Sequence, residues 1–154
     1  MLITLIGTPS QNSLPSGKRP VCHPLCSPVM QRFVENIEKA IASTPVILSS
    51  NIQKQFGPDN ETVYLRGNLL FTDFSVLEIA IFAARIHNAV SIDKYRFHYK
   101  DKQGQMLFRY DNAPHHPEIP SYPHHKHTIN KIIQSSMPSL QEVLNEIAAI
   151  IIAK

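Results

Sequence analysis

The sequence has no tryptophan, only two cysteines and no apolar run long enough to cross a bilayer. Its longest such run, Ile79 to Ala84, falls well short of the roughly 18 apolar residues that a spanning helix needs. The apolar first residues, MLITLIG, have no basic start and no small-residue cleavage site after them, which argues against a secretory signal. We therefore expect a cytoplasmic protein without a membrane-spanning segment.

The two cysteines, Cys22 and Cys26, flank His23 in the segment VCHPLC. Two thiolates with an imidazole between them resemble half of a zinc site, but no second cysteine pair completes a tetrahedron. Reduced, incidental thiols are the ordinary state of cysteines in the cytosol. We accordingly expect neither a disulfide nor a metal ion in this segment.

The net charge is also low, because 15 basic and 12 acidic residues leave only +3. This average is too weak to indicate nucleic-acid binding. The surplus is local, however: residues 94–131 contain seven basic and three acidic residues, or +4, so the rest of the chain carries −1. A length of 154 residues with 43% hydrophobic residues allows one compact domain and excludes a multidomain enzyme.

The first 28 residues hold five prolines and no acidic residue, and we expect them to form a disordered leader to a domain at 29–154. Ser27 and Pro28 are a typical helix start, and apolar residues then recur at helical spacing, which predicts a helix over 28–43. Near the other end, apolar residues from Leu140 to Ile151 predict a second helix. Ser136 or Ser139 is available as its cap, and Glu142 lies in its first turn.

Between the helices the apolar residues alternate. This pattern predicts strands over 46–50, 63–71 and 74–84, followed by a hairpin of 95–100 with 106–110. Gly67 within the second strand indicates a bulge or a close approach of two backbones. The predicted fold is α+β: a single antiparallel sheet of four to five strands, with the N-terminal and C-terminal helices packed on it.

The most unusual segment is PHHPEIPSYPHHKH, residues 114–127, which holds five of the eight histidines and four prolines. Prolines at every third position exclude a helix and predict a stiff, extended loop. Such a loop holds its side chains in fixed places, and it follows directly on Arg109 and Asp111 of the predicted hairpin. This loop is therefore the candidate site.

Four interpretations of the histidine segment remain open from the residues alone. Imidazoles near their ordinary pKa serve as acid and base in phosphodiester cleavage, with nearby cations neutralising the phosphate. The histidines with Asp111 also offer enough ligands for a metal ion, but adjacent side chains in an extended chain point opposite ways. The other two interpretations are a positive surface that binds RNA or protein without chemistry, and an exposed loop with no site.

The run YRFHYKDKQGQMLFRYDNAPHHPEIPSYPHHKH closely resembles the signature of the TumE family of prokaryotic toxins, small cytosolic proteins encoded beside a helix-turn-helix antitoxin. RYDNAPHH and YPHHKH are its most specific segments, and a weaker similarity extends over about residues 30–147. The resemblance implies the toxin of a type II toxin–antitoxin system, with that antitoxin as partner. It supplies no catalytic assignment.

Ribonuclease action is our inference from the histidines and the local charge. We expect catalysis without metal or other cofactor from six residues: Arg109, Asp111, His115, His116, His124 and His125. Arg109 would clamp a phosphate, Asp111 would orient an imidazole, and His116 with His125 would be acid and base. Four further residues are expected to bind nucleic acid: Arg96, Tyr110, Lys126 and His127. RNA is the expected substrate, and the alternatives are a non-catalytic binding module or a metal-dependent nuclease. The oligomeric state, including a homodimer, stays open.

Overall fold

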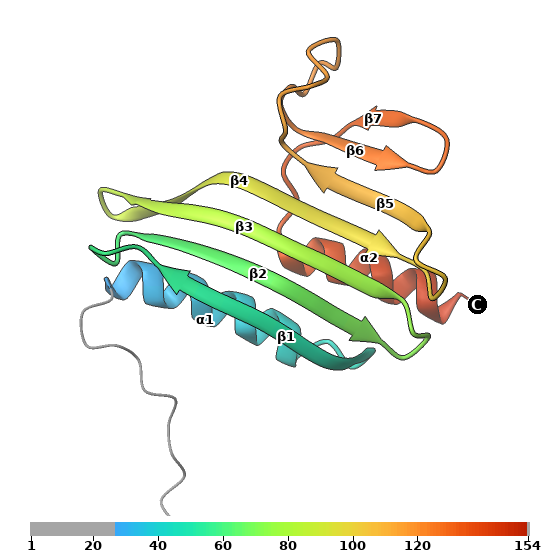
Figure 1. The fold of residues 1–154 in the computed structure, drawn as a ribbon, viewed down its shortest axis with the longest axis horizontal. Coiled ribbons are helices and arrows are strands. Elements are labelled where there is room, and N and C mark those ends of the chain that lie inside the picture. Colours follow the sequence, from blue (N-terminus) through green and yellow to red (C-terminus); the bar gives the residue numbers. More distant parts are fainter. Residues whose placement is uncertain (1–26, 154) are drawn as a thin grey trace, which may run out of the picture.

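The computed structural model describes residues 27–153, which form two helices and seven strands (Figure 1). In chain order these are α1 (Pro28–Ala42), β1 (Ile47–Phe56), β2 (Thr62–Phe71), β3 (Val76–Ile86), β4 (Ala89–Lys100), β5 (Met106–Asp111), β6 (His125–Thr128), β7 (Ile132–Gln134) and α2 (Leu140–Ile152). The predicted leader, with Cys22, His23 and Cys26, lies outside the described residues, apart from its last two positions.

All seven strands form one antiparallel sheet in sequential order, and both helices lie on the same side of it (Figure 1). The α+β class and the single antiparallel sheet were predicted correctly, but the predicted count of four to five strands was wrong. The extra strands, β6 and β7, are only four and three residues long. They form within a segment that lacks an apolar alternation, so the pattern that reveals a strand is missing there.

The two helices begin and end as their local sequences predict. Pro28 is at the start of α1, whose buried residues are Met30 and Val34. At α2 the Ser139 hydroxyl accepts a hydrogen bond from the Glu142 backbone N–H, while the Glu142 carboxylate accepts one from the Ser139 N–H at 2.7 Å. This capping box decides between the two predicted caps in favour of Ser139.

The long strands alternate between a buried and an open face, with the core between the sheet and the helices. Gly67 on β2 confirms the predicted close approach, because a Cβ there would lie 1.8 Å from the backbone oxygen of Asn51 on β1. The segment predicted as a strand over 74–84 is β3 (Val76–Ile86), which lies between β2 and β4. Two strands are longer than predicted: β1 continues to Phe56, and β4 begins at Ala89.

The opposite face of the sheet is not covered by a helix in the described part of the chain (Figure 1). It presents the residues that alternate with the core, among them Arg66 of β2, Glu78 of β3 and Arg96 of β4. We call this surface the open face. Within residues 27–153, no helix is both long and apolar enough to cross a membrane.

Candidate functional site

The pairing of β5 with β6 brings together residues from both sides of the proline-rich segment. Arg109 is opposite His127, and Asp111 is opposite His125. Because side chains alternate along a strand, these four residues share one face of the sheet, the open face. His127 and His125, at the far end of the proline-rich segment, are thereby held against Arg109 and Asp111.

The connecting segment 112–124 is not the extended loop that we predicted. It folds into successive turns, with the N–H groups of Ile119 and Tyr122 donating to the carbonyls of His116 and Ile119 at 3.2 and 2.9 Å. Proline fixes φ near −65°, a value that turns accommodate as well as extended chains do, so the prolines alone did not decide between the two. The turns fold the loop back over β5 and β6.

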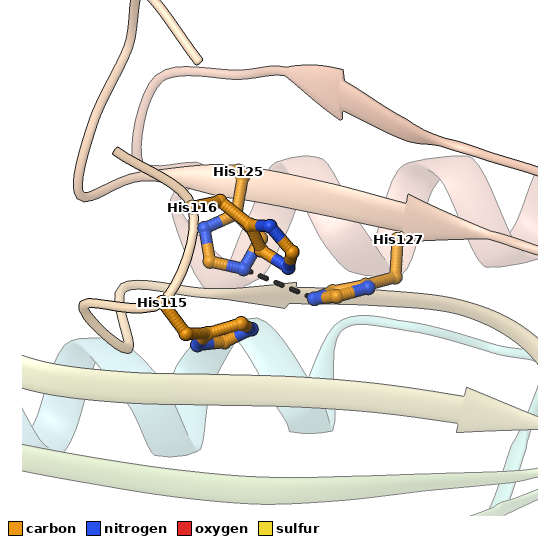
Figure 2. A group of neighbouring side chains, drawn as sticks. All are labelled: His115, His116, His125 and His127. Atoms are coloured by element: carbon orange, nitrogen blue, oxygen red, sulfur yellow. Dashed lines mark hydrogen bonds between the residues drawn. The ribbon is translucent and has the colours of Figure 1, made fainter. Parts of the chain in front are cut away.

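The folded loop places His115 and His116 beside His125 and His127 (Figure 2). One ring nitrogen of each histidine lies within 4.8 Å of the others. We call these four residues the histidine cluster. The expectation that only one of each adjacent pair could face a common point was wrong for His115 and His116, because the backbone there is not extended. It holds for the second pair, since only His125 faces the cluster.

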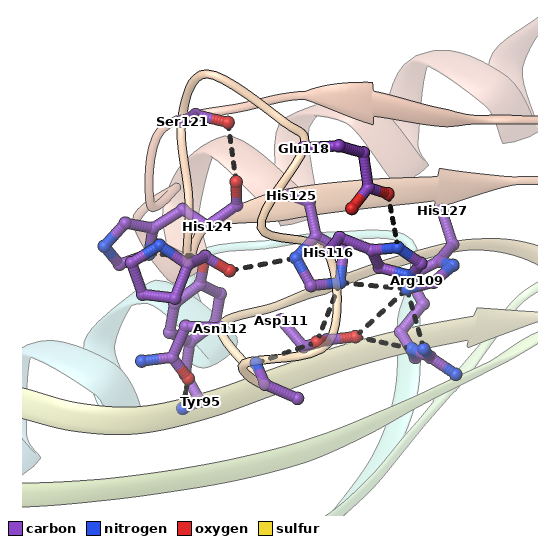
Figure 3. A network of polar contacts seen from close by, with 12 residues as sticks. Tyr95, Arg109, Asp111, Asn112, His116, Glu118, Ser121, His124, His125 and His127 are labelled. Carbon is purple, nitrogen blue, oxygen red and sulfur yellow. Dashed lines mark hydrogen bonds and ion pairs between the residues drawn. The ribbon is translucent and has the colours of Figure 1, made fainter.

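The carboxylate of Asp111 contacts several polar groups beside the cluster (Figure 3). Its buried carboxylate accepts from Arg109 Nε at 2.6 Å and from the Ala113 N–H at 3.1 Å, and it lies 3.1 Å from His125 Nε2. Burial acts to raise the pKa of Asp111. The bonds from Ala113 and Arg109 outweigh burial, so the pKa is lowered and the carboxylate stays charged.

His125 has both ring nitrogens engaged. Nδ1 lies 2.9 Å from the carbonyl oxygen of Pro123, which only accepts, so Nδ1 carries a proton. Nε2 lies between Asp111 Oδ1 and His127 Nε2, at 3.1 and 3.0 Å. His127 Nε2 is itself an acceptor, because it faces the Arg109 guanidinium at 2.8 Å. Two acceptors, Asp111 Oδ1 and His127 Nε2, thus converge on His125 Nε2.

The other imidazoles differ in their surroundings. Burial and the nearby Arg109 lower the pKa of His127 to about 4, so this ring is neutral near pH 7. His116 Nδ1 lies 3.0 Å from a carboxylate oxygen of Glu118, which leaves its Nε2 available to the cluster. His115 is exposed. The cluster therefore combines a neutral, partly buried ring, His127, with two rings that incoming groups can reach, His115 and His116.

The structure does not bring every predicted site residue to the cluster. His124 stacks on Tyr95, with ring centroids 5.8 Å apart, and its Nδ1 lies 3.2 Å from the tyrosine hydroxyl. Tyr110 and Lys126 lie on the helix-covered face, where both contact the Glu146 carboxylate of α2 at 2.8 and 2.5 Å. These two residues connect the sheet to α2.

Arg96 does lie on the open face, where a cleft of about 940 Å³ adjoins the cluster. Its lining includes four cationic side chains, from Arg66, Lys94, Arg96 and Arg109. Tyr64 and Phe82, directly opposite each other on β2 and β3, add aromatic surface. Arg109 and Asp111 line the cleft and also contact His127 and His125, so one end of the cleft lies beside the histidine cluster.

The sequence did not lead us to predict the contributions of Arg66, Tyr64 and Phe82 to this cleft, or that of Glu118 to the cluster. The first three lie at the alternate positions of strands that were predicted, so the alternation itself could have indicated their shared face. His98 is opposite Arg109 on β4, and its Nδ1 lies 3.4 Å from Glu78 Oε2.

One comparison with known proteins identifies a relationship. A protein-family model with the description Toxin TumE matches residues 37–153, which is most of the chain and includes every residue of the cluster and the cleft. Searches of curated proteins and of solved structures gave no match.

Proposed function

Because this chain belongs to the TumE family of toxins, we propose that it is the toxin of a type II toxin–antitoxin pair and that it cleaves RNA at the histidine cluster. The observation that carries this proposal is the position of the cluster. Four imidazoles, a guanidinium and a buried carboxylate converge at one end of a cleft lined by cations and aromatic rings. Phosphates and bases are the groups that such a lining attracts.

The proposed substrate path follows the open face. Arg66, Lys94 and Arg96 would neutralise successive phosphates of a single strand, and the Tyr64–Phe82 pair would stack against a base. Arg109 would hold the phosphate to be cleaved, because its guanidinium lies 2.8 Å from His127 and is oriented by Asp111. The strand would thereby present a phosphodiester to the imidazoles.

Cleavage requires two proton transfers. The ribose 2′-oxygen loses its proton to a base and bonds to the neighbouring phosphorus, and the bond from phosphorus to the 5′-oxygen breaks as an acid returns a proton to that oxygen. The products are a 2′,3′-cyclic phosphate and a 5′-hydroxyl end. We assign both transfers to groups of the cluster, to which His116 and His125 belong.

The toxin family implies an antitoxin partner. We propose that this partner is a helix-turn-helix protein encoded beside the toxin gene, and that the toxin acts in the cytoplasm. A neighbouring reading frame with that pattern, whose product co-purifies with the chain and restores growth, would support the assignment. Sedimentation of the chain alone would show whether it forms a homodimer.

The test uses the full chain without a purification tag and a labelled single-stranded RNA. The wild-type protein should produce fragments with 2′,3′-cyclic phosphate ends, and expression without antitoxin should arrest growth. His116→Ala should lower the cleavage rate by at least about 100-fold, the usual contribution of a positioned acid or base. His87→Ala is the matched control, because His87 is exposed in the β3–β4 turn and remote from the cluster in the register.

Three results would contradict the proposal. RNA that stays intact while the protein arrests growth would exclude RNA cleavage, and RNA binding without cleavage would identify a binding module instead. Growth arrest at the wild-type level by a His115→Ala/His116→Ala variant would place the toxic activity elsewhere.

A further inference from the structure

We propose that the histidine cluster binds one divalent transition-metal ion, with His116, His125 and His127 as ligands and the exposed His115 as a fourth. This inference deepens the proposed function and rests on it only for the ion's role in cleavage. The expected cytosolic state of the protein allows first-row ions such as Zn²⁺, whose preferred protein ligands include imidazole nitrogens.

The ring nitrogens of the cluster lie at distances that suit a metal ion. Zinc–nitrogen bonds of about 2.0–2.1 Å place two tetrahedral ligands roughly 3.3 Å apart. The Nε2 atoms of His125 and His127 are 3.0 Å apart, and the ligand atoms of all four rings lie within 4.8 Å of one another. Side-chain rotation of His115 and His116, which are on a loop, is enough to close the remaining difference.

The rings of His125 and His116 are oriented as those of metal ligands commonly are. A histidine that binds metal through one nitrogen commonly donates the other N–H to a carboxylate or a backbone carbonyl. His125 does so to the Pro123 carbonyl at 2.9 Å, and His116 is placed to do so to Glu118 at 3.0 Å. In both residues the nitrogen that these contacts leave is the one that faces the cluster.

Hydrogen-bond acceptors converge at the centre of the cluster. His127 Nε2 and Asp111 Oδ1 both face His125 Nε2, so electron pairs meet at one point with too few protons to separate them. A cation at that point would accept all of these electron pairs. Arg109 would keep its 2.6 Å bond to Asp111 when the ion replaces its contact with His127.

The objection to a metal ion in the sequence analysis was that adjacent histidines point opposite ways. That objection assumed an extended loop, and the turns of 112–124 remove it. An ion held here would lie beside the phosphate that we assign to Arg109, where it would stabilise the negative charge that develops during cleavage. His116 and His125 would then act as ligands, and the ion would supply a bound water as proton acceptor and donor in their place.

The experiment measures zinc in the untagged full chain by elemental analysis and by competition with a chromophoric chelator. We expect one zinc ion per wild-type chain, and at least tenfold weaker binding in His116→Ala and in His127→Ala. Glu118→Gln, which changes only the partner of His116, should weaken binding by about tenfold. His87→Ala and the variant Cys22→Ser/Cys26→Ser are the matched controls, and both should retain the ion.

Circular dichroism of each variant excludes unfolding as the cause. Glu118 is exposed and His116 and His127 are partly exposed, so these variants are safer than replacement of the buried His125. A wild-type chain without saturable zinc binding would overturn the inference, as would zinc that is lost in the cysteine variant but kept in the histidine variants. RNA cleavage by a metal-free chain would leave the proposed function standing. Zinc binding without cleavage in any metal state would instead contradict the proposed function.

Discussion

Asp111 is the residue with the most demanding surroundings in the site. Its side chain is 6% exposed, yet it carries a charge that is balanced by Arg109 and faces His125. Removal of one partner of a buried ion pair leaves the other charge uncompensated, which is commonly more destabilising than loss of a surface pair. The carboxylate therefore stabilises the β5–β6 pairing as well as orienting the imidazoles.

Asp111→Asn should accordingly lower the free energy of unfolding by about 3 kcal/mol, because it removes the charge that balances Arg109. The amide keeps the shape of the carboxylate, so the change tests the charge alone. Urea unfolding at pH 7 measures the change. Asp93→Asn is the matched control, since Asp93 is an exposed aspartate lining the same cleft, and its effect should be within about 0.5 kcal/mol. Equal losses of unfolding free energy in the two variants would mean that the buried contacts of Asp111 stabilise the protein no more than those of an exposed aspartate.

Among the elements, β3 and β4 show how the open face keeps charges in place. Glu78 of β3 is directly opposite His98 of β4, and its carboxylate accepts from Lys100 Nζ at 2.6 Å, with Arg96 3.8 Å away. The hydrogen bond and charge of Lys100, with smaller contributions from His98 and Arg96, lower the pKa of Glu78 against the opposing effect of burial. This cross-strand group links the centre of the sheet to the cleft.

A lowered pKa in the folded state means that the Glu78 contacts stabilise the protein fully above the ordinary pKa of 4.5. That stability is lost as the pH falls through the folded-state value. Glu78→Gln should therefore cost a few tenths to about 1 kcal/mol at pH 7 and nothing at a pH where Glu78 is protonated. Urea unfolding over a pH series tests this.

Asn68→Ala is the comparison for Glu78→Gln, because Asn68 is the β2 neighbour of Glu78 and carries no titratable group. Any loss of stability in that variant should be the same at every pH. If the cost of Glu78→Gln were also constant across the series, the ion pairs would not be the cause of its effect.

The elements also show which local signals suffice for prediction. Pro28 at the start of α1 and the Ser139–Glu142 box of α2 depend on neighbours within one helical turn, so their positions follow from the sequence. The positions of β6 and β7 do not follow from the sequence in this way. Their residues, HKHT and IIQ, show no alternation of apolar and polar side chains that would distinguish a strand from a loop. They form because β5 offers an edge to pair with, and that edge is distant in sequence.

At the scale of the whole molecule, the two helices lie on one side of the sheet and the cleft lies on the other. Four cations line the cleft, and each phosphate neutralised on a single strand releases counterions. If all four engage the strand, the logarithm of the binding constant should fall with the logarithm of salt concentration with a slope of about −3.

Arg66→Ala should weaken the slope by about 0.7, which corresponds to one phosphate contact on a single strand. Fluorescence anisotropy with a 2′-O-methylated oligonucleotide, which lacks the attacking hydroxyl, measures binding without cleavage. Arg32→Ala is the matched control, because Arg32 is an exposed arginine on α1, on the helix side of the sheet. A slope that changes equally in both variants would argue against the open face as the RNA path.

The sequence by itself determined the α+β class, the starting residues of both helices and the presence of the five longer strands, and it indicated the segment of the candidate site. These depend on local periodicity and on contacts between near neighbours.

Only the tertiary structure decided which side chains meet. The register of β5 with β6 set Arg109 and Asp111 against His127 and His125, and the turns of the loop added His115 and His116. The same packing turned Tyr110 and Lys126 toward α2. Pairing between distant strands is governed by burial and hydrogen bonding across the whole sheet, which no local pattern in the sequence records.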